Sequence, residues 1–137
     1  MKALPILFCL LMLNMPAQAA DGDYRLAQQS QAGTMLADSQ ASRYQQTVDN
    51  YNKVIRDNPK DANAYHGRGK AYYDLKQYPQ ALADFNQALK LGLKTAELYT
   101  DRGQTYVDME QYPQALADLN QAMKLAPKHV LAFQNRG

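Results

Sequence analysis

The chain has little that could support catalysis, a disulfide framework or a strongly charged interface. Among its 137 residues there is no tryptophan, one cysteine and only two histidines, His66 and His129. The 15 basic and 13 acidic side chains leave a formal net charge of +2 and are spread along the chain. The basic clusters that bind a phosphate backbone are missing, so nucleic acid is not an expected partner.

The few reactive side chains are not arranged as a catalytic or metal site. The two histidines lie far apart in the sequence, and neither belongs to the helical arrangement of paired histidines and a glutamate that binds zinc. The segment Gly67-Arg68-Gly69 lies inside a helical pattern, so it is not a phosphate-binding loop. We therefore predict no enzymatic activity, no catalytic residue, no cofactor and no metal.

Residues 1–19 have the features of a secretory signal peptide. After Met1 and Lys2 the run 3–13 is almost wholly apolar, and Ala17-Gln18-Ala19 places small residues where signal peptidase reads them. A retained membrane anchor is the alternative, but the apolar run is shorter than the roughly 20 residues that a membrane span needs. We expect cleavage after Ala19 and no stable membrane span.

Cleavage would also remove the cysteine. Cys9 lies inside the apolar run, so the mature chain would have no disulfide, no thiol nucleophile and no cysteine-based zinc site. The short signal resembles those of bacteria, which implies a periplasmic or secreted location and a partner in the bacterial envelope.

A 34-residue period organises the rest of the chain. Ala62–Thr95 aligns with Ala96–His129 at 20 identical positions of 34, a match that chance does not produce. A degenerate unit precedes them over residues 28–61, and the start of a further unit follows at residues 130–137. We therefore predict one helical repeat domain over residues 20–137.

Each unit is predicted to fold as two antiparallel helices. Apolar and small residues recur three and four positions apart, as in Tyr65, Gly69 and Tyr72, which is the periodicity of a helix. Pro79 and Pro113 suit the first turn of a second helix, where a missing amide hydrogen is harmless.

Other residues indicate where the helices end. Asn58-Pro59 and Ala126-Pro127 read as stops after a second helix, and Gly92 is expected to end the second helix between them. Residues 21–46, rich in Gln, Ser and Ala, are interpreted as a loose leading helix pair with a frayed start.

This pattern resembles the tetratricopeptide repeat (TPR) family. The family positions are filled by Tyr65, Gly69, Tyr72, Ala81, Phe85 and Ala88 in the first good repeat, and by Tyr99, Gly103, Tyr106, Ala115, Leu119, Ala122 and Pro127 in the second. The resemblance implies an all-α fold, a right-handed α-solenoid of antiparallel helix hairpins with an incomplete last repeat. The two helices of a hairpin are expected to approach most closely where Gly69 faces Ala81 and Gly103 faces Ala115.

Two sets of recurring side chains are interpreted as structural. The hydroxyl-tipped rings of Tyr72, Tyr78, Tyr106 and Tyr112 are expected to fill seams within and between hairpins. Arg68, Arg102 and Arg136 share one unit position, and each guanidinium is expected to reach a carboxylate or a neighbouring carbonyl. A ligand-binding basic stripe is the alternative for the arginines.

The resemblance also implies a concave groove lined by the first helices. The family's variable groove positions correspond here to Asn63, His66, Lys70, Tyr73, Asp74, Glu97, Thr100, Gln104, Val107 and Asp108. Most of these positions differ between two otherwise similar repeats, which suggests a partner-binding surface, although neutral drift on an exposed face would look similar.

The groove residues predict which ligands fit. The mixed polar lining suits an extended peptide or a helix of mixed charge. The family's clamp for a C-terminal carboxylate would fall on His66, Lys70 and Asp101, and Asp101 would repel a carboxylate. Recognition of chaperone tails is therefore disfavoured.

The leading functional hypothesis is an exported TPR scaffold or interaction module that binds a peptide or protein partner in its groove. The alternative is the N-terminal recognition part of a larger exported enzyme, such as a protease or a cell-wall enzyme. The sequence does not name the partner, because exposed side chains and not the repeat pattern carry specificity in this fold. It leaves the oligomeric state open.

Overall fold

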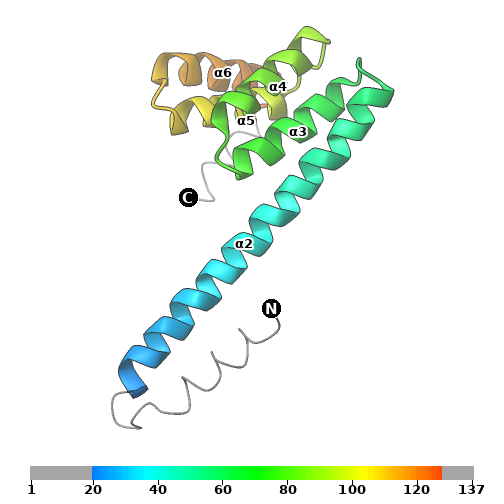
Figure 1. The fold of residues 1–137 in the computed structure, drawn as a ribbon. Coiled ribbons are helices and arrows are strands. Elements are labelled where there is room, and N and C mark those ends of the chain that lie inside the picture. Colours follow the sequence, from blue (N-terminus) through cyan, green and yellow to red (C-terminus); the bar gives the residue numbers. More distant parts are fainter. Residues whose placement is uncertain (1–19, 128–137) are drawn as a thin grey trace. The chain divides into compact units, whose positions relative to one another are not determined.

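The computed structural model describes residues 20–127, with side chains from residue 28 onward. Five helices follow one another without a strand in this range (Figure 1): α2 (Ala20–Asp57), α3 (Ala62–Asp74), α4 (Tyr78–Lys90), α5 (Ala96–Asp108) and α6 (Tyr112–Leu125). The predicted all-α fold class is confirmed. The predicted signal peptide, residues 1–19, and the start of a further repeat, residues 130–137, lie outside the described residues.

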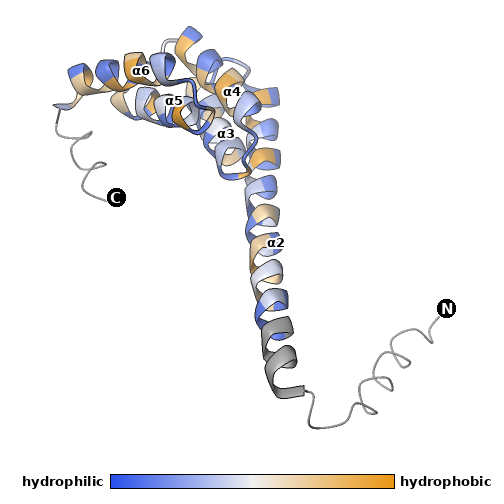
Figure 2. Cartoon of the chain, turned by 90° about the vertical axis from the view of Figure 1, so that its left-hand side faces the viewer, coloured by the Kyte–Doolittle hydropathy of each residue, from blue (hydrophilic) through white to orange (hydrophobic). Residues whose placement is uncertain are grey.

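Four of the helices form two hairpins, α3 with α4 and α5 with α6. Helix α5 also packs on both α3 and α4, which stacks one hairpin on the other. Bands of hydrophobic and hydrophilic residues alternate along α4 and α6 (Figure 2), as expected of helices that bury one face. No helix between residues 20 and 127 combines the length and the apolar character that crossing a bilayer requires.

Helix α2 contradicts the prediction of a leading helix pair. Residues 21–46 belong to one uninterrupted helix that runs from Ala20 to Asp57. The sequence offers nothing strong enough to break it, because no proline occurs between Pro16 and Pro59. The two glycines of the helix, Gly22 and Gly33, cost only about 1 kcal/mol each relative to alanine.

The chain divides into two units within α2, between Gln40 and Ala41. In the first unit the described side chains, residues 28–40, are all exposed, including Met35 and Leu36. The second unit contains the end of α2 together with α3 to α6, and the candidate site lies entirely within this unit.

The helix starts follow the predicted chemistry. A carboxylate oxygen of Asp61 accepts hydrogen bonds from the backbone N–H groups of Asn63 and Ala64, at 3.0 and 3.1 Å, which satisfies two donors that the first turn of α3 leaves open. Pro79 and Pro113 lie in the first turns of α4 and α6, as predicted.

The predicted stops are also confirmed. Helix α2 ends at Asp57, directly before Asn58-Pro59, and α6 ends at Leu125, directly before Ala126-Pro127. After α4, Gly92 adopts a φ of +99°, and the N–H of Leu93 bonds back to the carbonyl of Ala88 at 3.0 Å. This left-handed turn is the common glycine-dependent end of a helix.

The two first helices end in the same way but without glycine. Lys76 follows α3 with a φ of 62°, and Glu110 follows α5 with a φ of 60°. The next backbone N–H bonds back to the helix in both cases, from Gln77 to Tyr72 and from Gln111 to Tyr106, each at 2.8 Å. A side chain in this left-handed conformation costs roughly 1–2 kcal/mol.

Glycine at the end of α5 should therefore stabilise the fold. We expect Glu110→Gly to raise the free energy of unfolding by about 1 kcal/mol, because glycine adopts a positive φ without the Cβ penalty. Thermal melting followed by circular dichroism measures the change. Gly92→Ala is the matched reverse variant and should lower the melting temperature; a lower temperature for Glu110→Gly would contradict the turn geometry.

The core of the stacked hairpins is small and lies between α4 and α5. Ala81, Phe85, Ala88 and Leu98 are fully buried, with the rings of Tyr65, Tyr72 and Tyr73 and the side chains of Leu89 and Leu93 packed around them. In the second half of α2, Val48 is also buried.

The two helices of each hairpin approach closely at the glycines, and the predicted contact with Ala81 is present at Gly69. A Cβ added to Gly69 would lie 3.3 Å from the backbone oxygen of Ala81 and 2.7 Å from the ring of Phe85, so Gly69 does meet Ala81. At Gly103 the nearest atoms belong to Leu119, at 3.1 Å, and Asp118, at 3.3 Å. Both neighbours belong to α6, so the two helices of the second hairpin also approach closely at Gly103.

Three of the four recurring tyrosines pack against neighbouring side chains, and one is exposed. Tyr72 and Tyr106 are half-buried, each with an arginine guanidinium 5.8 Å from its ring centre, and Tyr78 packs against Tyr73 with ring centres 5.7 Å apart. Tyr112 is 61% exposed, so the prediction that it fills a seam is wrong in the described structure.

The recurring arginines are structural, as predicted. Arg68 donates two hydrogen bonds to the carboxylate of Asp84, both at 2.7 Å, and a third to Asn52 at 2.8 Å. The bond to Asp84 raises the pKa of Arg68 despite its partial burial. Asp84 itself is buried. This contact ties α3 to α4 and to α2.

The second hairpin repeats the same contact. Arg102 bonds to both oxygens of Asp118, at 2.7 and 2.6 Å, and to Asn86 at 2.7 Å. Bidentate pairing of this kind uses the planar fork of a guanidinium, which lysine lacks. Arg136, the third member of the series, lies outside the described residues.

Breaking one of these buried pairs should be costly. In Asp118→Leu we expect the free energy of unfolding to fall by about 3 kcal/mol, because Arg102 keeps its charge without a partner in a site where only 18% of its side chain is exposed. Urea titration followed by circular dichroism measures the loss.

Two further variants make that measurement specific. Arg102→Met combined with Asp118→Leu should recover much of the loss, because no charge is then left unpaired. Lys70→Met breaks the pair with Glu97, in which both side chains are about half exposed, and should cost at most about 1 kcal/mol. Equal losses in Lys70→Met and Asp118→Leu would contradict a special role for the buried pair.

Candidate functional site

Two adjoining open hollows lie between the end of α2 and the first helices of the two repeats, α3 and α5. One, of about 390 Å³, lies between α2, α3 and the start of α5. The other, of about 360 Å³, lies between α3 and α5. Lys70 and Asp74 line both, so we treat the two hollows as one surface and call it the groove.

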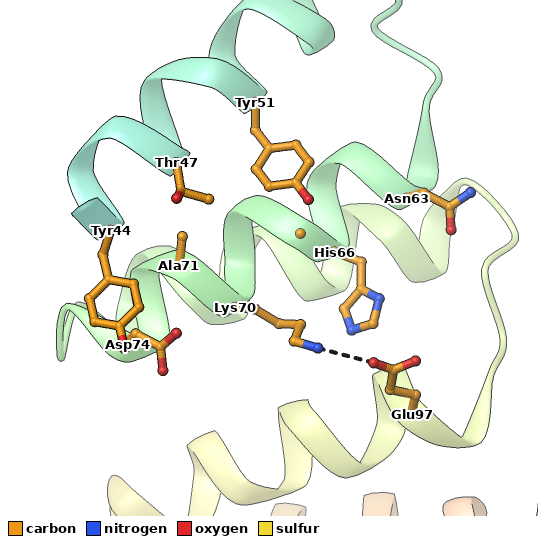
Figure 3. Close-up of a pocket in the computed structure, with 10 residues that line it drawn as sticks. Tyr44, Thr47, Tyr51, Asn63, His66, Lys70, Ala71, Asp74 and Glu97 are labelled. Atoms are coloured by element: carbon orange, nitrogen blue, oxygen red, sulfur yellow. Dashed lines mark hydrogen bonds and ion pairs between the residues drawn. The ribbon is translucent and has the colours of Figure 1, made fainter. Parts of the chain in front are cut away.

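Helices α2 and α3 face each other across the first hollow (Figure 3). The rings of Tyr44 and Tyr51 and the side chain of Thr47 project from α2, opposite His66 and Lys70 on α3. Asn63, Ala71 and Asp74 complete the α3 side, and Glu97 belongs to α5. This wall consists of polar groups and aromatic rings that come from three helices.

A glycine allows α2 to lie against α3 here. A Cβ added to Gly67 would lie 2.2 Å from Cζ of Tyr51, so the ring lies directly over the glycine backbone. The corresponding residue of the second repeat is Asp101. The Gly-x-Gly spacing in the sequence does not indicate this role of Gly67, whereas in the structure an aromatic ring of the groove packs against it.

Polar contacts join α3 to α5 along the groove. His66 Nε2 lies 2.7 Å from Asp101 Oδ2, Lys70 Nζ donates to Glu97 Oε1 at 3.0 Å, and Tyr73 Oη donates to Asp108 Oδ2 at 2.5 Å. The last contact adds to the effect of burial, and together they raise the pKa of Tyr73 well above its ordinary value. These contacts hold the two first helices at a fixed spacing.

Most of the predicted groove residues line the two hollows. The structure places seven of the ten there: Asn63, His66, Lys70, Tyr73, Asp74, Glu97 and Gln104. Asp108 is exposed and bonded to Tyr73, and Val107 is partly buried, but neither lines a hollow.

Two of the predicted residues are buried and offer little to a partner. Thr100 is 4% exposed, and its hydroxyl donates to the carbonyl of Ala96 in its own helix at 2.8 Å. His66 is 9% exposed, with its ring edge-on to Phe85 at 5.8 Å between centres. Both residues lie on a first helix, as the repeat pattern predicted, but their side chains point toward the interior of the protein.

The sequence analysis also missed part of the groove. It did not predict that Tyr44, Thr47 and Tyr51 contribute, because it treated the leading unit as degenerate. Thr47 and Tyr51 lie four positions apart, which is the spacing of one helical face, and this signal could have placed them together.

One cluster in the groove has donor atoms that could hold a cation. His66, Glu97 and Asp101 each offer one ligand atom, and these atoms lie within 4.8 Å of one another. Lys70 already supplies a positive charge to Glu97 at 3.0 Å, so a metal ion would have to displace an ammonium group. The set therefore acts as a hydrogen-bonded link between α3 and α5.

Comparison with known proteins agrees with this architecture. A family model described as TPR repeat matches residues 39–76 and 69–110, and one described as Tetratricopeptide repeat matches residues 96–129. A search of curated proteins finds no match.

Solved structures of TPR proteins share the fold. The TPR domain of Arabidopsis OM64 is 25% identical, with a TM-score of 0.63 over 73% of this chain and 84% of its own. YrrB, described as a TPR protein with an unusual peptide-binding site, is 28% identical, with a TM-score of 0.59 over 65% of this chain and 46% of its own. MamA is 24% identical, with a TM-score of 0.58 over 64% of this chain and 50% of its own.

This chain therefore spans about half the length of MamA and of YrrB. The stacked hairpins form a TPR solenoid, as the repeat pattern predicted. The family matches, taken together with the paired helices and the 34-residue period, show that the chain belongs to the tetratricopeptide repeat family.

Proposed function

We propose that this protein is an exported, non-enzymatic module that holds an extended segment of a protein partner in the groove between α2, α3 and α5. The observation that carries the proposal is the groove itself, which presents hydrogen-bonding and aromatic side chains from three helices over two adjoining hollows. Concave surfaces of this kind are how stacked repeats bind their partners.

A peptide suits the groove better than a small metabolite. The hollows are open and continuous with each other through Lys70 and Asp74, whereas small-molecule sites are enclosed and mostly apolar. The similar protein YrrB has a peptide-binding site according to its description, which supports the same use here. A partner segment would lie across α3 and contact α2 on one side and α5 on the other.

Peptide selection against the full chain tests this function. We expect a random displayed peptide library to yield ligands that shift the backbone NMR signals of Tyr51, Lys70 and Gln104 and leave those of Asn86 and Asn120 unchanged. The first three residues line the groove, and the two asparagines are exposed on the second helices α4 and α6.

A steric variant gives the control for that test. Gln104→Trp would fill the hollow between α3 and α5 without changing charge, and should weaken the selected peptides by about tenfold or more, since 1.4 kcal/mol of lost contact is a factor of ten. Asn120→Trp adds the same side chain at an exposed position of α6 and should leave binding unchanged. Peptides that bind Gln104→Trp as well as the parent would show that the groove is not the site.

Export rests on residues 1–19 and needs its own measurement. We expect the protein recovered from the extracytoplasmic fraction of a bacterial host to have an intact mass that begins at Ala20. Ala19→Leu places a large residue at the cleavage point and should block processing. A recovered parent protein that retains Met1 would contradict cleavage.

The intact mass of the protein from its native source tests the alternative function. A native protein whose mass extends past Gly137 would favour the recognition part of a larger exported enzyme, whose catalytic residues would then lie beyond this sequence.

A further inference from the structure

The groove carries more negative charge than its own cations neutralise. Four carboxylates line or border it, those of Asp74, Glu97, Asp101 and Asp108. The cations that act on them are Lys70 within the groove and Lys76 at the turn after α3. In the described structure only Glu97 has a lysine or arginine in salt-bridge contact.

None of the other three carboxylates has a lysine or arginine in salt-bridge contact in the described structure. Asp101 lies against His66, and Asp108 accepts from Tyr73 and, at 3.3 Å, from Gln104. No described residue donates a hydrogen bond to Asp74. Partial burial raises its pKa, and the charge of Asp101 adds to this effect, while Lys70 and Lys76 oppose it.

The scaffold aspartates show that the chain can neutralise carboxylates when stability requires it. Asp84 and Asp118 are each held by both nitrogens of an arginine fork. The groove carboxylates lack such partners although the whole chain has a formal charge of +2. Acidic charge is therefore concentrated on this surface and is available to a ligand.

Aromatic rings beside these carboxylates add a second feature that suits cations. Tyr44 and Tyr51 line one hollow and Tyr73 lines the other. Guanidinium and ammonium groups are attracted to the faces of such rings. The protein already uses this contact in its scaffold, where the guanidinium of Arg68 lies 5.5 Å from the ring centre of Tyr65.

We propose that the groove selects an extended peptide segment rich in lysine and arginine, with its cations placed between the groove carboxylates and the tyrosine rings. This inference rests on the proposed peptide-binding function and names the chemistry of the ligand. An acidic segment would face Asp74 and Asp101 across the hollow, and like charges brought together across an interface are unfavourable.

The composition of selected peptides tests the proposal directly. Ligands selected at low salt from a random displayed library should be enriched in Lys and Arg relative to the unselected library. Replacing those residues by Gln in the most enriched peptide should weaken binding at least about tenfold, and raising the salt concentration should weaken the parent peptide, because exposed charges are screened.

Paired variants separate the groove from the net charge of the chain. Asp74→Asn combined with Asp101→Asn removes two groove charges and should weaken the enriched basic peptide by about tenfold, as expected for two partly exposed charge contacts. Asp49→Asn combined with Asp57→Asn makes the same change at exposed positions of α2 that line neither groove hollow and should leave affinity nearly unchanged. Thermal melting of both double variants confirms that they are folded.

The results distinguish failure of this inference from failure of the proposed function. Acidic or uncharged ligands that still shift the signals of Lys70 and Gln104 would overturn the selectivity for basic segments and leave peptide binding intact. Equal loss of affinity in the two double variants would also overturn the selectivity, because the effect would then come from net charge. A library without any groove ligand would refute both.

Discussion

In each of the two good repeats, one arginine bonds both to an aspartate of its own hairpin and to an asparagine of the preceding helix. These contacts fix how the helices stack, and the rest of the structure depends on them. Arg68 grips the buried Asp84 in its own hairpin and reaches back to Asn52 on the preceding helix, and Arg102 repeats the contact one hairpin later. A first helix that slipped by one residue would leave a buried carboxylate and a guanidinium unpaired, which costs several kcal/mol. The hydrophobic effect compacts the hairpins, but this charged contact specifies how one follows the next.

The fixed spacing of the first helices determines what the groove can do. Because α3 and α5 are held by the arginine contacts behind them, polar side chains in front can meet across the gap, as His66 meets Asp101 and Tyr73 meets Asp108. The contact of Tyr73 with the exposed Asp108 lies near the surface, so its loss would not unfold the protein in the way that loss of Arg102 would. The contact of His66 with Asp101 is largely buried. The arginine contacts and the groove side chains thus lie on different faces of the same helices. Groove residues can therefore be substituted without disrupting the arginine contacts.

The sequence predicted the parts of this architecture that depend on local chemistry. The proline starts of α4 and α6 and the glycine turn at Gly92 were correct, because caps and turns act within a few residues. The prediction of a helix pair missed that α2 is a single helix, because small helix propensities add up over many residues and no proline interrupts them. The inward direction of Thr100 and the contact of Tyr51 with Gly67 could not be predicted, because they depend on how helices rotate against one another after packing.

The uneven treatment of aspartates is the clearest indication of function in the fold. In the scaffold, Asp84 and Asp118 have complete sets of charged partners; in the groove, Asp74 has no hydrogen-bond donor within the described structure, although partial burial and Asp101 both disfavour its charge. Asp74 caps no helix and joins no ion pair in the described structure, so the stability of the scaffold does not account for this exposed carboxylate. Residues that do not serve stability are concentrated at functional sites. A carboxylate without a partner in the groove would suit a cationic ligand. Under the proposed selectivity for basic segments, the groove acids would serve a partner, whereas the arginine contacts serve the repeat stack.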